Sequence, residues 1–174
     1  YYEHARANDL YLSFAVTPAS GRKSAELFPG QQRDDPNLQV VAEDSSGVTV
    51  SGMKMLATSA VYADEILIGN LTPIDDSFKS EPITAAMPLN TPGVSLWARQ
   101  PYALAVRHEA DYPLSYRFDE TDAVLVCDQV KIPWERVFLH NDAAMSRRIY
   151  IETPANCSSI PSRRCAPSHT REFR

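Results

Sequence analysis

The chain has 174 residues, of which 44% are hydrophobic and 22% charged, and its net charge is −5. These proportions are typical of one globular domain with a real core, and they exclude a disordered chain. The net negative charge argues against a nucleic-acid-binding surface. A membrane-spanning helix needs about 18 consecutive apolar residues, and no segment of the sequence approaches that. We therefore expect neither nucleic acid nor a membrane among the partners.

The three cysteines, Cys127, Cys157 and Cys165, show neither CxxC spacing nor a partner at zinc-site spacing. Cys127 lies in an apolar run, which predicts a buried small hydrophobic residue. We expect a reduced, cytoplasmic protein without a metal site.

Short strands separated by turns dominate the chain after a helical end over residues 1–9. The predicted strands are residues 10–16, 38–43, 48–51, 53–58, 63–68, 83–88, 94–99 and 123–127. Asp44-Ser45-Ser46-Gly47 predicts a hairpin turn, and residues 100–113 are irregular. The many short strands predict an all-β barrel or sandwich.

The longest ordered string, PLSYRFDETDAVLVCDQVKIPWERVFLH, covers residues 113–140. Its apolar run Ala123–Cys127 predicts a buried strand, and Asp128–Gln129 predicts a turn. Pro133 has no N–H to donate, so we expect it to end regular pairing.

Three further strings accompany it: YYEHARANDLYL at residues 1–12, GVTVSGMKMLATSA at 47–60 and MPLNTPG at 87–93. In order and spacing, the four strings resemble the oxygenase component of two-component, reduced-flavin-dependent aromatic monooxygenases. This is the 4-hydroxyphenylacetate 3-hydroxylase family, which includes pyoverdine-chromophore and chlorophenol oxygenases. The resemblance covers residues 1–155.

The resemblance implies an acyl-CoA dehydrogenase-like fold, in which a central β domain lies between two helical domains. This chain would be mainly β: a central β-barrel or sandwich domain with short flanking helices. We expect residues 1–9 to end the N-terminal helical domain and 10–141 to form the β domain. Residues 142–157 would begin the C-terminal helical domain, with its first helix over residues 142–151, and 158–174 would be an aberrant or disordered tail.

The activity implied by the resemblance is hydroxylation of a phenolic substrate with O2 and reduced FAD, with FMN as the alternative cofactor. A separate flavin reductase would supply the reduced flavin, and the full-length enzyme would be a homo-oligomer, a dimer or tetramer. We expect this chain to be a fragment that is inactive alone. No catalytic residue is assigned, because the cofactor carries the chemistry.

The resemblance places two groups of residues against the flavin. Thr58 matches the last residue of the family motif G-A-[RK]-M-x-A-T, and its hydroxyl could donate to a flavin ring nitrogen. The family's flavin-contacting loop N-P-Q-x-x-R matches Pro18, Ala19, Ser20, Gly21 and Arg22. Without the resemblance, Thr58 would be a strand-end residue bonded to the backbone, and Arg22 a solvated loop charge.

The substrate site departs from the hydroxyphenylacetate hydroxylases. Those enzymes have a His that touches phenol and flavin where this chain has Phe14 or a gap, and a Ser-Thr pair near Leu71 and Thr72. The phenol is therefore oriented differently, or the substrate is another phenol.

Other interpretations stay open at this point. Asp119, Glu120 and Asp122 are interpreted as a cluster paired with Arg117 at the start of a strand rather than as acid–base catalysts. The chain could belong to an acyl-CoA dehydrogenase-like flavoprotein, or be a non-catalytic β-sandwich binding module. An exposed aromatic stripe would favour the binding module, and its candidate residues are Trp97, Tyr102, Tyr112 and Tyr116.

Overall fold

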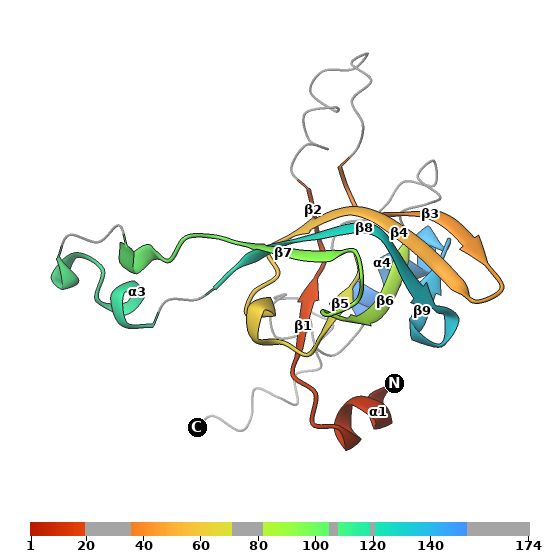
Figure 1. The fold of residues 1–174 in the computed structure, drawn as a ribbon, viewed down its shortest axis with the longest axis horizontal. Helices are drawn as coiled ribbons and strands as arrows, with labels where there is room; N and C mark the ends of the chain where they lie inside the picture. The colour runs from red at the N-terminus through yellow and green to blue at the C-terminus, as the bar shows by residue number, and fades with distance from the viewer. Residues whose placement is uncertain (20–35, 71–81, 105–107, 119–120, 153–174) are drawn as a thin grey trace, which may run out of the picture.

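The strands of this chain form two sheets that share one core (Figure 1). The computed structural model describes residues 1–19, 36–70, 82–104, 108–118 and 121–152. The mainly β prediction is confirmed. The described strands make two separate sheets, so closure into a barrel stays a prediction.

The first sheet has four strands in the order β1-β5-β6-β9. They are β1 (Leu12–Ala15), β5 (Glu65–Ile68), β6 (Ile83–Pro88) and β9 (Val137–His140). β1 runs parallel to β5, whereas the other pairs are antiparallel. Along β1, Ser13 and Ala15 are buried while Leu12 and Phe14 are exposed, because successive side chains of a strand point to opposite faces.

The second sheet has the order β2-β4-β8-β7, with β3 paired to β4. Its strands are β2 (Thr17–Pro18), β3 (Gln39–Asp44), β4 (Gly47–Met55), β7 (Val94–Ala98) and β8 (Ala123–Pro133). β3 and β4 form the predicted hairpin. Its turn is held by the Asp44 carboxylate, which accepts hydrogen bonds from the Ser46 backbone N–H and hydroxyl at 2.8 and 2.7 Å.

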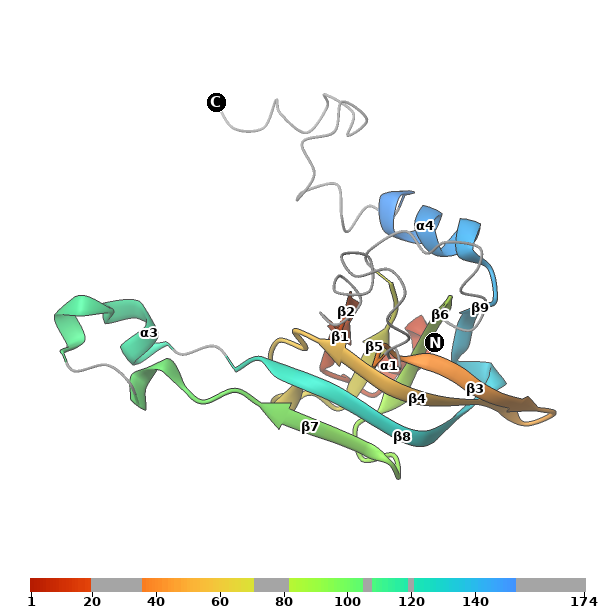
Figure 2. The same cartoon turned by 90° about the horizontal axis from the view of Figure 1, so that it is seen from above.

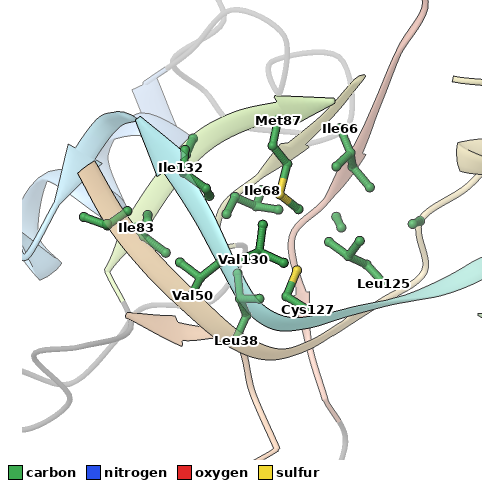
Figure 3. Close-up of a cluster of buried hydrophobic side chains, with 14 of the residues drawn as sticks. Leu38, Val50, Ile66, Ile68, Ile83, Met87, Leu125, Cys127, Val130 and Ile132 are labelled. Carbon is green, nitrogen blue, oxygen red and sulfur yellow. The ribbon is translucent and has the colours of Figure 1, made fainter. Parts of the chain in front are cut away.

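Both sheets contribute side chains to the core (Figure 3). The labelled side chains are Leu38, Val50, Ile66, Ile68, Ile83, Met87, Leu125, Cys127, Val130 and Ile132, all 3% exposed or less. Burying a large aliphatic side chain stabilises a fold by about 1.5–3 kcal/mol, so this cluster holds the two sheets together. Burial also raises the pKa of the Cys127 thiol to about 12, and the prediction that Cys127 is a buried hydrophobic residue is confirmed.

The expected turn at Asp128–Gln129 is wrong, because β8 continues through these residues to Pro133. A register shift lies here instead: Val50 pairs with Val130, but Gly52 pairs with Cys127. Gln129 has a φ of 51°, and its backbone and side-chain N–H groups donate to Ser51 Oγ at 2.9 and 3.1 Å. β8 has one more residue than β4 across this shift, and these hydrogen bonds hold it in a β-bulge. Pro133 is the last residue of β8, as expected.

The α-helices among the described residues are α1 (Tyr2–Ala7), α3 (Pro113–Arg117) and α4 (Ala143–Glu152). The Asp142 carboxylate accepts a hydrogen bond from the Met145 N–H at 2.8 Å and caps α4, which confirms the helix predicted there. α3 lies in the segment between β7 and β8 that extends away from the sheets (Figure 2). Within the described parts of the chain, no helix has the length and apolar character needed to cross a membrane.

Gly52 gives a direct test of the bulge. Its φ is 114°, and an added Cβ would lie 2.4 Å from the Asn37 carbonyl oxygen. We expect Gly52→Ala to lower the free energy of unfolding by about 2–4 kcal/mol, since it adds backbone strain and a clash with main-chain atoms. Urea denaturation measures this change.

Gly69→Ala is the matched control, because its Cβ would meet only side-chain atoms at ordinary contact distances, namely Val16 Cγ1 at 3.5 Å and Thr84 Oγ1 and Cγ2 at 3.8 and 3.9 Å. It should change the free energy of unfolding by no more than about 0.5–1 kcal/mol. Equal effects of the two substitutions would contradict the strain at Gly52.

Candidate flavin and substrate site

Thr58 lies in a sharply turned segment just after β4. Its neighbours Leu56 and Ser59 have φ values of 60° and 57°, in the left-handed region that non-glycine residues seldom adopt. Ala57 exchanges backbone hydrogen bonds with Ala123 at 2.9 and 3.2 Å, which ties the turn to the start of β8. Strained backbone of this kind concentrates at functional sites, because the surrounding structure must stabilise it.

The Thr58 side chain is exposed and bonded to another side chain. Its hydroxyl donates to Asp122 Oδ1 at 2.6 Å, and its carbonyl accepts from Ser13 Oγ at 2.7 Å. Asp122 Oδ2 lies 3.8 Å from Arg99 Nε, and the Arg99 guanidinium carbon lies 3.9 Å from the centre of the Tyr102 ring. The interpretation of Thr58 as a residue satisfying a backbone group is therefore wrong.

The start of the predicted flavin loop lies beside the end of β4. Thr17 pairs with Met55 and Pro18 with Lys54 in an antiparallel register, so β2 lies alongside the last residues of β4. Ala19 is buried, at 3% exposed. The loop residues Ser20, Gly21 and Arg22 lie outside the described residues.

Lys54 is a feature that sequence reasoning missed. It is 1% exposed, and its Nζ donates to Asn70 Oδ1 at 2.8 Å, while Asn70 Nδ2 donates to the Ile83 carbonyl at 3.3 Å. A buried ammonium needs such polar partners, because removing it from water is costly. A signal for Lys54 was present in the sequence, because this residue occupies the [RK] position of the family motif and lies between Met53 and Met55.

Phe14 borders an apolar hollow between α1 and the first sheet. The hollow has a volume of about 320 Å³, and its lining residues are Tyr1, Tyr2, Ala5, Leu12, Ser13, Phe14 and Leu67. Phe14 is 61% exposed, so an aromatic face is available on this side of β1. Leu71 and Thr72, the other predicted substrate residues, lie outside the described residues.

A buried carboxylate fixes α1 beside this hollow. Glu65, 5% exposed, accepts hydrogen bonds from the Tyr1 hydroxyl at 2.8 Å and from Arg136 Nη1 at 2.7 Å, and His4 Nε2 lies 3.7 Å away. Burial and the bond to Glu65 raise the pKa of Tyr1 to about 12. For Glu65, burial raises the pKa, but the bonds from Arg136 and Tyr1 together outweigh it, so the pKa lies below its ordinary value.

The predicted pairing of Arg117 with the carboxylates before β8 is wrong for Asp122. Arg117 forms a hydrogen bond and ion pair with Glu109, eight positions earlier, whereas Asp122 faces Arg99, which directly follows β7. Asp119 and Glu120 lie outside the described residues. Local sequence could not reveal the Arg99 partner, because β7 and β8 are joined by a long excursion.

The four aromatic residues of the alternative binding module are all exposed, but they belong to different elements. Trp97 is on β7, Tyr102 is in a 3-10 turn, and Tyr112 and Tyr116 lie at or in α3. They form no stripe along one strand or helix face. Among the residues that the structure describes, no group of three or more His, Cys, Asp or Glu side chains could hold a metal ion.

Comparison with known proteins places this architecture in a fold class. A probable acyl-CoA dehydrogenase from Mycobacterium abscessus has a similar structure, with a TM-score of 0.53 at 18% identity over 87% of this chain and 34% of that one. This likeness shows the acyl-CoA dehydrogenase-like fold. The model of the family described as 4-hydroxyphenylacetate 3-hydroxylase N terminal matches residues 1–139, and the chain belongs to that family.

Individual relatives agree with this membership. The 4-hydroxyphenylacetate 3-monooxygenase oxygenase component of Geobacillus sp. (strain PA-9) is 34% identical over 89% of this chain. The crystal structure of an oxygenase component (HpaB) complexed with FAD and 4-hydroxyphenylacetate has a TM-score of 0.72 at 30% identity, over 87% of this chain. The chain spans 31% of the length of each of these two proteins.

The Glu65 contacts predict a pH dependence. Because the pKa of Glu65 is lowered in the folded state, its contribution to stability is present above its ordinary value of 4.5 and is lost as the pH falls through the folded value. We expect Glu65→Gln to lower the free energy of unfolding at pH 7 by about 1–3 kcal/mol, since it weakens two charge-assisted bonds. The variant should also lose less stability than the parent protein between pH 7 and pH 4.

Urea denaturation at both pH values measures these differences, and Glu3→Gln, an exposed position on α1, is the control. A Glu65→Gln variant with the same acid sensitivity as the parent protein would contradict the role of Glu65.

Proposed function

We propose that the protein carrying this chain is the oxygenase component of a two-component aromatic monooxygenase. It would hydroxylate a phenol with O2 and reduced FAD supplied by a separate flavin reductase, and residues 10–141 would be its central β domain. One observation carries the proposal. In a chain of this family, Ser13 bonds to the Thr58 carbonyl at 2.7 Å, so the strand that presents Phe14 also holds the turn that presents Thr58.

The residues around the end of β4 suit a flavin. Thr58 is an exposed residue with a hydroxyl, and Lys54 is the register partner of Pro18. Pro18 and Ala19 directly precede Ser20, Gly21 and Arg22 in the sequence, and we propose all five as flavin-binding residues. When bound, reduced FAD supplies two electrons, so that one oxygen atom of O2 enters the phenol ring and the other leaves as water. The chain's own contribution is to hold and orient the ring system. FAD is proposed over FMN, since the similar oxygenase structure is a complex with FAD.

The hollow beside Phe14 suits the ring of a phenol. An aromatic pair contributes about 0.5–1.5 kcal/mol beyond the area it buries, so the exposed Phe14 ring can select a flat aromatic substrate. Phe14 cannot exchange a hydrogen bond with the phenol hydroxyl, as an imidazole at that position could. We therefore propose Phe14, Leu71 and Thr72 as substrate-binding residues that orient the phenol by packing and by the Thr72 hydroxyl.

The Thr58 hydroxyl provides the test of the site. In the full-length protein, Thr58→Val should weaken binding of reduced FAD about tenfold, because one neutral hydrogen bond contributes about 0.5–1.5 kcal/mol. Anaerobic titration measures this affinity. Product formation with a reductase, O2 and a panel of phenols measures the activity.

Thr49→Val, which removes a half-buried hydroxyl from the far end of β4, is the matched control and should leave the FAD affinity unchanged. If Thr58→Val binds reduced FAD as tightly as the parent protein and hydroxylates fully, Thr58 does not belong to the site.

A further inference from the structure

The hydrogen bond between Thr58 and Asp122 limits what the Thr58 hydroxyl can do toward a ligand. A hydroxyl has one proton to donate, and an ionised carboxylate can only accept. With Oγ1 at 2.6 Å from Asp122 Oδ1, the proton of Thr58 points at the carboxylate. The oxygen's remaining lone pairs can therefore only accept a hydrogen bond from a group on the exposed side.

Both partners of this bond are held in place from other strands. The Arg99 N–H donates to the Asp122 carbonyl at 3.0 Å, and Arg99 Nε faces Asp122 Oδ2 at 3.8 Å. On the Thr58 side, the Ser59 N–H donates to the Thr121 carbonyl at 2.7 Å, and Ser13 Oγ donates to the Thr58 carbonyl. The direction of the hydroxyl is thus set by the fold before any ligand arrives.

We propose that Asp122 is a positioning residue that makes Thr58 a hydrogen-bond acceptor toward N5 of the flavin ring, so that the site binds reduced FAD in preference to oxidised FAD. The inference rests on the proposed function. The N5 atom of the flavin ring carries a lone pair when oxidised and an N–H when reduced. An acceptor facing it gains a hydrogen bond with the reduced ring and meets a lone pair in the oxidised one. This assignment reverses the expectation that Thr58 donates to a ring nitrogen.

Such a preference suits an oxygenase that receives its flavin from a separate reductase. The protein must capture reduced FAD and release oxidised FAD after each turnover. A hydroxyl free to rotate could donate to the oxidised ring and accept from the reduced one, and would favour neither. The Asp122 carboxylate removes that freedom.

The negative charge of Asp122 and its hydrogen bond with Thr58 have opposite effects on the reduction potential of bound FAD. An anion near the ring disfavours the electron-rich reduced form, so removing only its charge would raise the reduction potential of bound FAD. Freeing the Thr58 hydroxyl to donate to the oxidised ring would lower that potential. The sign of the change separates the two effects.

The experiment compares Asp122→Ala with Asp128→Ala in the full-length protein. Asp128 is an exposed carboxylate on β8, so its removal changes the net charge equally without touching Thr58. For Asp122→Ala, we expect the ratio of the Kd for oxidised FAD to the Kd for reduced FAD to fall about tenfold, which lowers the potential of bound FAD by about 30 mV. Asp128→Ala should leave the ratio unchanged. An unchanged or increased ratio for Asp122→Ala overturns the proposal.

Thr58→Val gives an independent test that keeps the pair of Asp122 and Arg99. A loss of affinity confined to reduced FAD supports the proposal. If oxidised FAD loses as much affinity as reduced FAD, or more, the flavin site stands but the assignment of Thr58 as an acceptor is overturned. If neither affinity changes, Thr58 does not contact FAD, and the proposed flavin site fails together with this inference.

Discussion

The pairing of β4 with β8 is the constraint on which the rest of the structure depends. β4 is also the partner of β2 and β3, and β8 is the partner of β7, so every strand of the second sheet is placed through these two. The bulge at Gly52 and Gln129 shifts the register between β4 and β8 by one residue. Where the pairing ends, the hydrogen bonds between Ala57 and Ala123 bring Thr58 to Asp122, residues that are 64 positions apart in the sequence.

Most of the fold follows from local patterns. The strand at residues 83–88 was predicted with the bounds that β6 has, and the hairpin around Asp44–Gly47 was predicted from its turn residues. The helix after Asp142 was predicted from the family resemblance. The error at Asp128–Gln129 has a physical cause. Polar residues with a tendency to turn also suit a bulge, and only the distant Ser51 hydroxyl decides between the two.

The site was less accessible to sequence reasoning than the fold. Thr58 and the start of the loop at Pro18 came from motif resemblance, and the structure brings both to the end of β4. The partners of these residues did not follow from the sequence, because Asp122, Arg99 and the buried Lys54 act through contacts between strands. A charged residue in a strand has no local signal that says which distant group it meets.

Successive side chains of β1 point to opposite faces of the sheet, so this short strand can have two separate roles. Ser13 points inward and holds the Thr58 turn, whereas Phe14 points outward to the hollow beside α1. A substitution at Phe14 can therefore reshape the hollow while the bond from Ser13 stays intact. An insertion or deletion of one residue in β1 would exchange the two faces and abolish both roles at once.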